Sequence, residues 1–274
     1  MKNVKLSQKL TESGLMLALT TILSVLAIAK LPYGGSITFA SMLPMTIIAY
    51  RYGFTWGLLT GATYGLIQML LGMDTLSYAT SVTAVIAIIL LDYIFAFMST
   101  ALGGLFRKSS NQVAALTNAT LLVCIVRYLF HVISGCTVWA GLSIPTADAL
   151  IYSIIYNATY MLPEMIITCV AAVYLGSSLD FRTKQLTAAE KGAKAPKPVG
   201  ILTAVSGLLI LGAVAAIVAL VFPHLQDAET GSFNIEGINQ VNNTLILSII
   251  GGVLLGVIIM YLISKSIINK QGNK

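Results

Sequence analysis

The sequence predicts an all-α membrane protein, built as a six-helix bundle followed by a C-terminal two-helix transmembrane hairpin. Hydrophobic residues make up 57% of the 274 residues and charged residues only 9%, which is more apolar than the core of a soluble domain could absorb. The apolar runs are long and lack the strict alternation of outer-membrane strands. The basic residues gather on alternate connections, as in a chain that crosses a bilayer repeatedly.

Eight spans are expected along the chain. They lie near residues 13–30, 38–50, 54–73, 79–104, 112–134, 149–177, 199–222 and 244–264. A crossing helix needs ~20 residues, so the second span is too short to cross alone. It must borrow residues from the preceding "LPYGGSITF" or stop short of the outer face, and irregular backbone there must be buried in protein or line a cavity.

The first span follows a basic head, Met1 to Lys9, which runs into apolar sequence without a small-residue cleavage pattern. We therefore expect this segment to remain as the first helix. The second to sixth spans complete the bundle, and the fourth, fifth and sixth carry its intramembrane charges. The seventh and eighth spans, "GILTAVSGLLILGAVAAIVALVF" and "TLILSIIGGVLLGVIIMYLIS", contain no charged residue and are typical of packing or anchoring helices.

The distribution of charge predicts the orientation in the membrane. With the N-terminus in the cytoplasm, all but Lys30 and the intramembrane Arg127 of the sixteen Lys and Arg residues fall inside. The expected location is the cell (plasma) membrane, with multiple spans and both termini cytoplasmic.

One segment, "SSLDFRTKQLTAAEKGAKAPKPVG", changes abruptly from apolar to Lys, Ala and Pro. It divides the chain into a six-helix module at 1–180, a basic cytoplasmic linker at 181–198 and a two-helix extension at 199–274.

Several kinds of chemistry lack sequence support. No nucleotide-binding GxxxxGK[ST] loop, HExxH, CxxC or GxSxG motif is present, and the three cysteines sit in or beside apolar segments without metal-ligand spacing. The net charge of +6 follows the membrane topology rather than a nucleic-acid surface. We expect no enzyme activity, no cofactor, no metal and no nucleic-acid partner, and any ATP hydrolysis that drives transport must belong to another chain.

Four ionisable residues of the first module lie within spans: Asp92, Arg127, His131 and Glu164. Each costs about 2.5 to 3.5 kcal/mol at a helix centre if charged and unpaired. The directions of the fifth and sixth spans place Arg127 and Glu164 at similar depth. We therefore expect these two residues to form a structural ion pair.

Asp92 would then lack a protein cation. His131 and Asn157 are expected at the outer level of the bundle, together with Trp139 and the tyrosines that open the sixth span, Tyr152, Tyr156 and Tyr160. Such residues also form interfacial aromatic belts. A belt does not require a carboxylate, whereas ring faces with one carboxylate suit a flat organic cation.

Four stretches, in their order and spacing, closely resemble the thiamine-specific S component of energy-coupling factor (ECF) transporters, the ThiT family. They are "LPYGGSITFASMLPMTIIAYRYG", "LLDYIFAF", "RYLFHVISGCTVW" and "YSIIYNATYMLPEMIIT". The likeness covers about residues 5 to 180. It implies a six-helix protein that binds vitamin B1 in an outward-facing pocket and docks onto a transmembrane T component with two cytoplasmic ATPase subunits.

The resemblance also implies roles for individual residues. The substrate-binding residues that it implies are Asp92, Tyr93, His131, Gly135, Trp139, Tyr152, Asn157, Tyr33 and Tyr78. Asp92 stands where the family has glutamate, and Tyr33 where tryptophan is expected. In "ESGLMLALTTIL", Gly14 and Ala18 match a small-xxx-small pattern used to dock on the T component.

The expected function is high-affinity capture of thiamine outside the cell, with a lid around Tyr33 to Ser36 controlling access. Two alternatives remain open at this point. A stand-alone proton-coupled thiamine permease would use Arg127, Glu164 or Asp92 as a relay. An intramembrane lipid-modifying enzyme would use His131 as a base with Asp92.

Overall fold

The computed structural model describes residues 4–79, 81–138, 147–189, 197–225 and 236–272. It divides into two compact units, Met1–Ala189 and Glu190–Lys274. The all-α fold is confirmed, because helices make up almost all of the regular structure in the described residues.

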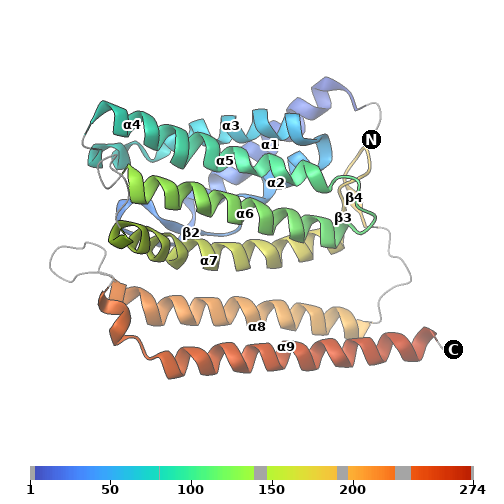
Figure 1. Ribbon diagram of the computed structural model, residues 1–274. Helices are drawn as coiled ribbons and strands as arrows, with labels where there is room; N and C mark the ends of the chain where they lie inside the picture. The colour runs from blue at the N-terminus through green and yellow to red at the C-terminus, as the bar shows by residue number, and fades with distance from the viewer. Residues whose placement is uncertain (1–3, 80, 139–146, 190–196, 226–235, 273–274) are drawn as a thin grey trace. The chain divides into compact units, whose positions relative to one another are not determined.

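Unit 1 is a helical bundle with two short hairpins (Figure 1). Its α-helices are α1 (Leu6–Val25), α2 (Leu43–Tyr52), α3 (Phe54–Leu71), α4 (Val82–Ile88), α5 (Ala96–Met98), α6 (Gln112–Thr137) and α7 (Ala147–Ser178). Tighter or wider helical segments are η1 (Pro32–Gly34), η2 (Met73–Tyr78), the π-helical η3 (Ile89–Phe95) and η4 (Ser99–Phe106). The strands are β1 (Ala27–Lys30), β2 (Ser36–Thr38), β3 (Leu179–Asp180) and β4 (Thr187–Ala188).

The first expected span ends early. α1 stops at Val25, and β1 pairs antiparallel with β2 to form a hairpin. The prediction that the helix continues to residue 30 is wrong. Pro32 disfavours helical backbone at the residue before it, and the turn that follows places Tyr33 and Gly34 at positive φ.

The second expected span is confirmed as too short to cross. All ten residues of α2 are buried, and at 1.5 Å per residue the helix is about 15 Å long. One face packs Leu43, Ile47 and Tyr50 against α6 and α7. The opposite face packs against Tyr64 of α3 and Phe97 of α5. α2 is therefore the core of unit 1 rather than a lipid-facing span.

Unit 2 is an antiparallel pair of long helices, α8 (Lys197–Val221) and α9 (Asn243–Gly272), with short 3-10 turns η5 (Phe222–Leu225) and η6 (Glu236–Gln240) (Figure 1). The two helices pack on each other. Their exposed apolar faces suit lipid contact.

Five described helical segments are long and apolar enough to cross a membrane, which supports a multi-pass membrane protein. They are Val82–Phe106, Gln112–Thr137, Ala147–Ser178, Pro198–Leu225 and Asn243–Asn269. The three other expected spans correspond to α1, α2 and α3, which fall short for different reasons. α1 starts with polar residues such as Lys9 and Glu12, α2 has ten residues, and α3 carries Gln68 and several Thr and Gly residues.

Candidate ligand-binding site

Asp92 and His131 lie together in unit 1. Asp92 is in the π-helical η3, and its Oδ1 lies 2.8 Å from Nδ1 of His131 in α6. The hydroxyl of Ser134, one turn after His131, donates to Oδ2 of Asp92. The side chains of His131 and Asp92 are 11% and 15% exposed. A π-helical turn shifts the residues that follow it around the helix axis, and such turns recur at functional sites.

Arg127 fixes the state of the imidazole. Its Nε donates to Nε2 of His131 at 3.2 Å. Because an arginine Nε–H can only donate, Nε2 must accept, and the ring proton therefore sits on Nδ1. His131 is thus neutral and donates to the Asp92 carboxylate.

The expected ion pair between Arg127 and Glu164 is not formed as a direct contact among the described residues. Arg127 donates through Nη1 to the sulfur of Met42 and lies over the ring of Phe97, 4.7 Å from its centroid. Glu164 instead accepts from the backbone N–H of Thr38 and, at 2.6 Å, from its hydroxyl. The buried β2 strand carries donors of its own, and these satisfy the carboxylate at close range.

Asn157 joins α6 and α7. Its Nδ2 donates to the carbonyl oxygens of Ser153 at 2.8 Å and His131 at 3.3 Å, and its Oδ1 accepts from Tyr160. Gly135 makes this close approach possible, since a Cβ there would lie 2.2 Å from the Ser153 hydroxyl. Asn157 and Gly135 therefore lie beside His131, as expected.

Tyrosine rings form a continuous series from the β1–β2 hairpin to His131. Tyr33 contacts Tyr78 at 5.3 Å and Tyr156 at 6.3 Å between ring centroids. Tyr156 stacks on Tyr152 at 6.3 Å and contacts Tyr160 at 5.7 Å, and Tyr160 reaches His131 at 6.3 Å. The predicted residues Tyr33, Tyr78 and Tyr152 thus belong to one aromatic cluster.

The hairpin that carries Tyr33 is attached to α7 by polar contacts. The Tyr156 hydroxyl donates to the carbonyl of Pro32 and accepts from the N–H of Gly35 at 3.1 Å. Thr38, at the other end of the hairpin, is held by Glu164. The expected lid segment is therefore anchored to the helix that carries Asn157.

The predicted residue Tyr93 stands apart from this cluster. The Tyr93 hydroxyl donates to the carbonyl of Gly72 at 3.0 Å and lies 2.6 Å from the Thr75 hydroxyl, toward η2 rather than toward His131. Trp139 lies outside the described residues. The described residues contain no group of three or more His, Cys, Asp or Glu that could hold a metal ion.

The structure adds two residues that the sequence reasoning did not name, Ser134 and Ser153. It also gives contacts to Tyr156 and Tyr160, which the sequence places at this level without a role in binding. Ser134 follows His131 by three residues, and this helical spacing could have identified it. The side chain of Tyr156, by contrast, bonds a loop 124 positions away, which no local pattern indicates.

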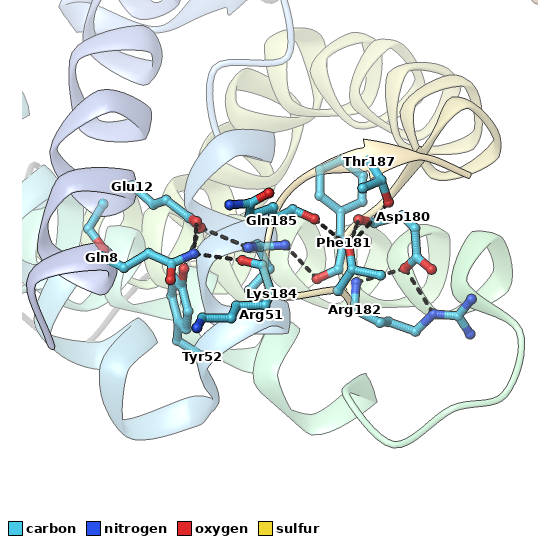
Figure 2. A network of polar contacts seen from close by, with 12 residues as sticks. Gln8, Glu12, Arg51, Tyr52, Asp180, Phe181, Arg182, Lys184, Gln185 and Thr187 are labelled. Carbon is cyan, nitrogen blue, oxygen red and sulfur yellow. Dashed lines mark hydrogen bonds and ion pairs between the residues drawn. The ribbon is translucent and has the colours of Figure 1, made fainter. Parts of the chain in front are cut away.

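A second polar cluster lies where the first half of α1 meets the C-terminal end of α2 (Figure 2). Arg51 donates through Nε to Glu12 at 3.0 Å and through Nη1 to the carbonyl of Phe181 at 2.7 Å, while Tyr52 donates to the same Glu12 oxygen. Gln8 bridges Glu12 and the carbonyl of Lys184. This network ties α1 and α2 to the β3–β4 hairpin.

The network shifts the pKa values of Glu12 and Tyr52, two residues that lie outside the expected spans. Burial raises the pKa of Glu12, but hydrogen bonds from Tyr52 and Gln8 and the charge of Arg51 outweigh it, so the net pKa is lowered. Burial, with the bond to Glu12, raises the pKa of Tyr52 to about 12.

Gly14 and Ala18, the predicted docking pair, are both exposed on α1, and a Cβ at Gly14 would meet nothing within 4 Å. The same face exposes Leu15 and Leu19. This face is open to lipid or to another helix.

Comparison with known proteins identifies relatives of unit 1. The family described as "Thiamine transporter protein (Thia_YuaJ)" matches residues 10–182. Thiamine transporter ThiT of Bacillus subtilis (strain 168) is 32% identical over 179 residues, which are 61% of this chain and 89% of that protein. A solved structure of ThiT from Listeria monocytogenes aligns with a TM-score of 0.48 and 22% identity, over 61% of this chain and 92% of that one. Since the family matches well over half of the chain, this chain belongs to the thiamine transporter protein family.

Proposed function

We propose that this protein captures thiamine from outside the cell and delivers it inward together with an ATP-driven energy-coupling module. Asp92 and Asn157 bind the aminopyrimidine, while His131, Trp139 and Tyr152 contact the rings, including the cationic thiazolium. Tyr33 and Tyr78 cover the site, and Gly135 lets α6 and α7 approach closely beside it. Family membership supports the substrate, and the named relatives are transporters rather than enzymes.

The observation that carries the proposal is the place of the carboxylate. Asp92 accepts from the imidazole of His131 and from the hydroxyl of Ser134, at one end of the tyrosine cluster. The tyrosine cluster begins at that imidazole and ends at the exposed Tyr78. A negative group beside a series of ring faces favours a flat cation such as thiazolium.

Tryptophan fluorescence provides the test. The chain contains two tryptophans, so Trp56→Phe leaves Trp139 as the single reporter. We expect thiamine to quench this signal at submicromolar concentration. Asp92→Asn should weaken binding at least about tenfold, because it removes a charge-assisted contact.

Asp148→Asn is the matched control, since Asp148 is exposed at the start of α7. It should bind as the parent does. Equal affinity of Asp92→Asn and Asp148→Asn would refute the proposed site.

The coupling module is tested separately. We expect Gly14→Leu to abolish co-purification with T-component and ATPase subunits while leaving thiamine binding intact, because a bulky side chain blocks close helix approach. Gly200→Leu, at another glycine with open space around it, should change neither. Co-purification of Gly14→Leu at parental yield would contradict docking through α1.

One observation favours a second candidate, the stand-alone proton-coupled permease. His131 and Asp92 are hydrogen-bonded to each other beside Arg127, and chains of His and carboxylate groups are an arrangement that proton relays use. Thiamine uptake by this protein in cells or vesicles without any ATPase partner would establish the permease and exclude the shared motor.

A further inference from the structure

A pocket lies in unit 1 far from Asp92. Tyr50, Arg51, Arg107, Phe181 and Arg182 line a cavity of about 50 Å³. The backbone N–H of Phe181 donates to Oε1 of Gln112, the first residue of α6. His131, which contacts Asp92, lies nineteen residues further along the same helix. At 1.5 Å per residue the two sites are about 28 Å apart, so the pocket is separate from the proposed thiamine site.

The hydroxyl of Tyr50 is the first sign of a ligand. Tyr50 is 1% exposed, and its oxygen has no hydrogen-bond partner among the described residues. Leaving a buried hydroxyl unsatisfied is costly, and such groups are rare in native proteins. Tyr50 is one of the residues that line the pocket, and an acceptor bound there within reach of its hydroxyl would satisfy it.

The arginines still have N–H groups to offer. Nη2 of Arg51 lies 2.9 Å from Glu12 as an ion pair but is not aligned for a hydrogen bond, so its protons have no acceptor. Arg182 uses Nε on Asp180 and Nη1 on the Ser110 carbonyl, and its Nη2 is not used by either contact. Each guanidinium carries five donors.

Arg107 supplies the excess charge. A Cβ at Gly53 would lie 3.3 Å from Nη1 of Arg107, which places this guanidinium against the end of α2. Within the described part of the chain, Arg107 has neither a hydrogen bond from its side chain nor an ion pair. The nearby acids, Glu12 and Asp180, are each engaged by another arginine. Three guanidinium groups and two carboxylates leave a net charge of +1.

We propose that this pocket binds a phosphate group. The pocket is lined by donors of α2 (Tyr50 and Arg51), of the residue after η4 (Arg107) and of the β3–β4 hairpin (Arg182). A tetrahedral oxyanion offers oxygens in several directions, whereas a carboxylate offers two in one plane. The phosphate comes either from free inorganic phosphate or from the headgroup of an anionic phospholipid. The charge distribution puts this end of the bundle on the cytoplasmic side, where anionic lipids create a negative surface potential.

Thermal unfolding of the purified full-length protein in neutral detergent tests the free ion. Inorganic phosphate is titrated at constant ionic strength, with chloride as the balancing salt. We expect the unfolding midpoint to rise with phosphate, and the half-saturating concentration to increase about tenfold in Tyr50→Phe and in Arg107→Ala. Tyr50→Phe removes only an unpaired hydroxyl, so the fold is retained. Lys108→Ala is the control, because it removes a neighbouring exposed charge that does not line the pocket. Its half-saturating phosphate concentration should stay within about twofold of that of the parent.

The lipid arm repeats the measurement in phosphatidylcholine nanodiscs with and without phosphatidylglycerol. Stabilisation by inorganic phosphate alone assigns the free ion, and stabilisation by phosphatidylglycerol that Tyr50→Phe and Arg107→Ala both weaken assigns the headgroup. The proposal is overturned if neither phosphate nor phosphatidylglycerol gives a stabilisation that these two variants weaken. It is also overturned if Lys108→Ala weakens the stabilisation as much as Arg107→Ala does.

Discussion

Arg51 is the buried cation of the polar cluster in Figure 2, and its loss should affect the stability of the fold. Its side chain is 0% exposed and that of Glu12 is 19% exposed. We expect Arg51→Ala to lower the free energy of unfolding by about 3 to 5 kcal/mol, because it leaves a partly buried carboxylate without its cation. Arg182→Ala breaks a pair whose arginine is 46% exposed and should cost under about 1 kcal/mol. Chemical denaturation of both variants compares them, and equal losses would contradict this account.

The lowered pKa of Glu12 predicts a pH dependence of stability. A carboxyl whose pKa is lower in the folded than in the unfolded state contributes stability above its ordinary pKa of 4.5, and this contribution is lost as pH falls through the folded value. The unfolding midpoint should therefore decline as the pH drops below 4.5, and less steeply in Glu12→Gln. A Glu12→Gln curve parallel to that of the parent would show that another group dominates.

His131 predicts a pH dependence of binding rather than of folding. Its Nε2 accepts from Arg127, so protonation would place two donors face to face and add positive charge beside a cationic ligand. Thiamine affinity should weaken as pH falls from about 7 to about 5. Fluorescence titration across this range measures it, and flat affinity would contradict a neutral His131 in the site.

At the scale of elements, the contact between α6 and α7 depends on one small residue. A Cβ at Gly135 would lie 2.2 Å from the hydroxyl of Ser153, whereas one at Gly251 in α9 would meet nothing within 4 Å. Gly135→Ala should therefore destabilise the protein by about 1 to 3 kcal/mol and weaken thiamine binding, because α6 and α7 must separate. Gly251→Ala should be neutral or slightly stabilising. Thermal unfolding and fluorescence titration of the pair check both statements.

The elements that carry the site were only partly predictable. The fifth and sixth spans, expected at 112–134 and 149–177, closely match α6 and α7, since long apolar runs bounded by polar residues define helices well. The fourth span was predicted as an ordinary helix, yet Asp92 lies in a π-helical segment. Hydrophobic pattern does not distinguish an extra residue per turn, because the distinction arises from packing.

At the scale of the whole molecule, the proposed thiamine site lies entirely in unit 1. A chain shortened to residues 1–189 should therefore bind thiamine within about twofold of the full-length protein. Fluorescence titration of the shortened chain measures this. Loss of binding in a shortened chain that keeps its helical circular-dichroism spectrum would assign unit 2 a part in the site.

The sequence by itself determined the all-α membrane fold, the family and the set of polar residues to be considered. The fold and the polar residues follow from composition and from long apolar runs, which are local properties of a chain in a bilayer, whereas the family follows from the resemblance of four stretches of sequence. The sequence also placed His131 and Asn157 at the same depth in the bundle, whereas Gly135 was implied only by the resemblance to the family.

Only the tertiary structure decided which polar groups meet. Arg127 and Glu164 were matched by depth alone, but Glu164 bonds Thr38 of the β1–β2 hairpin and Arg127 bonds His131. Depth gives one coordinate of a side chain, whereas a hydrogen bond requires agreement in all three within a few tenths of an ångström. The rotation of each helix about its axis and the fold of the hairpin supply the other coordinates, and both are set by contacts between distant parts of the chain.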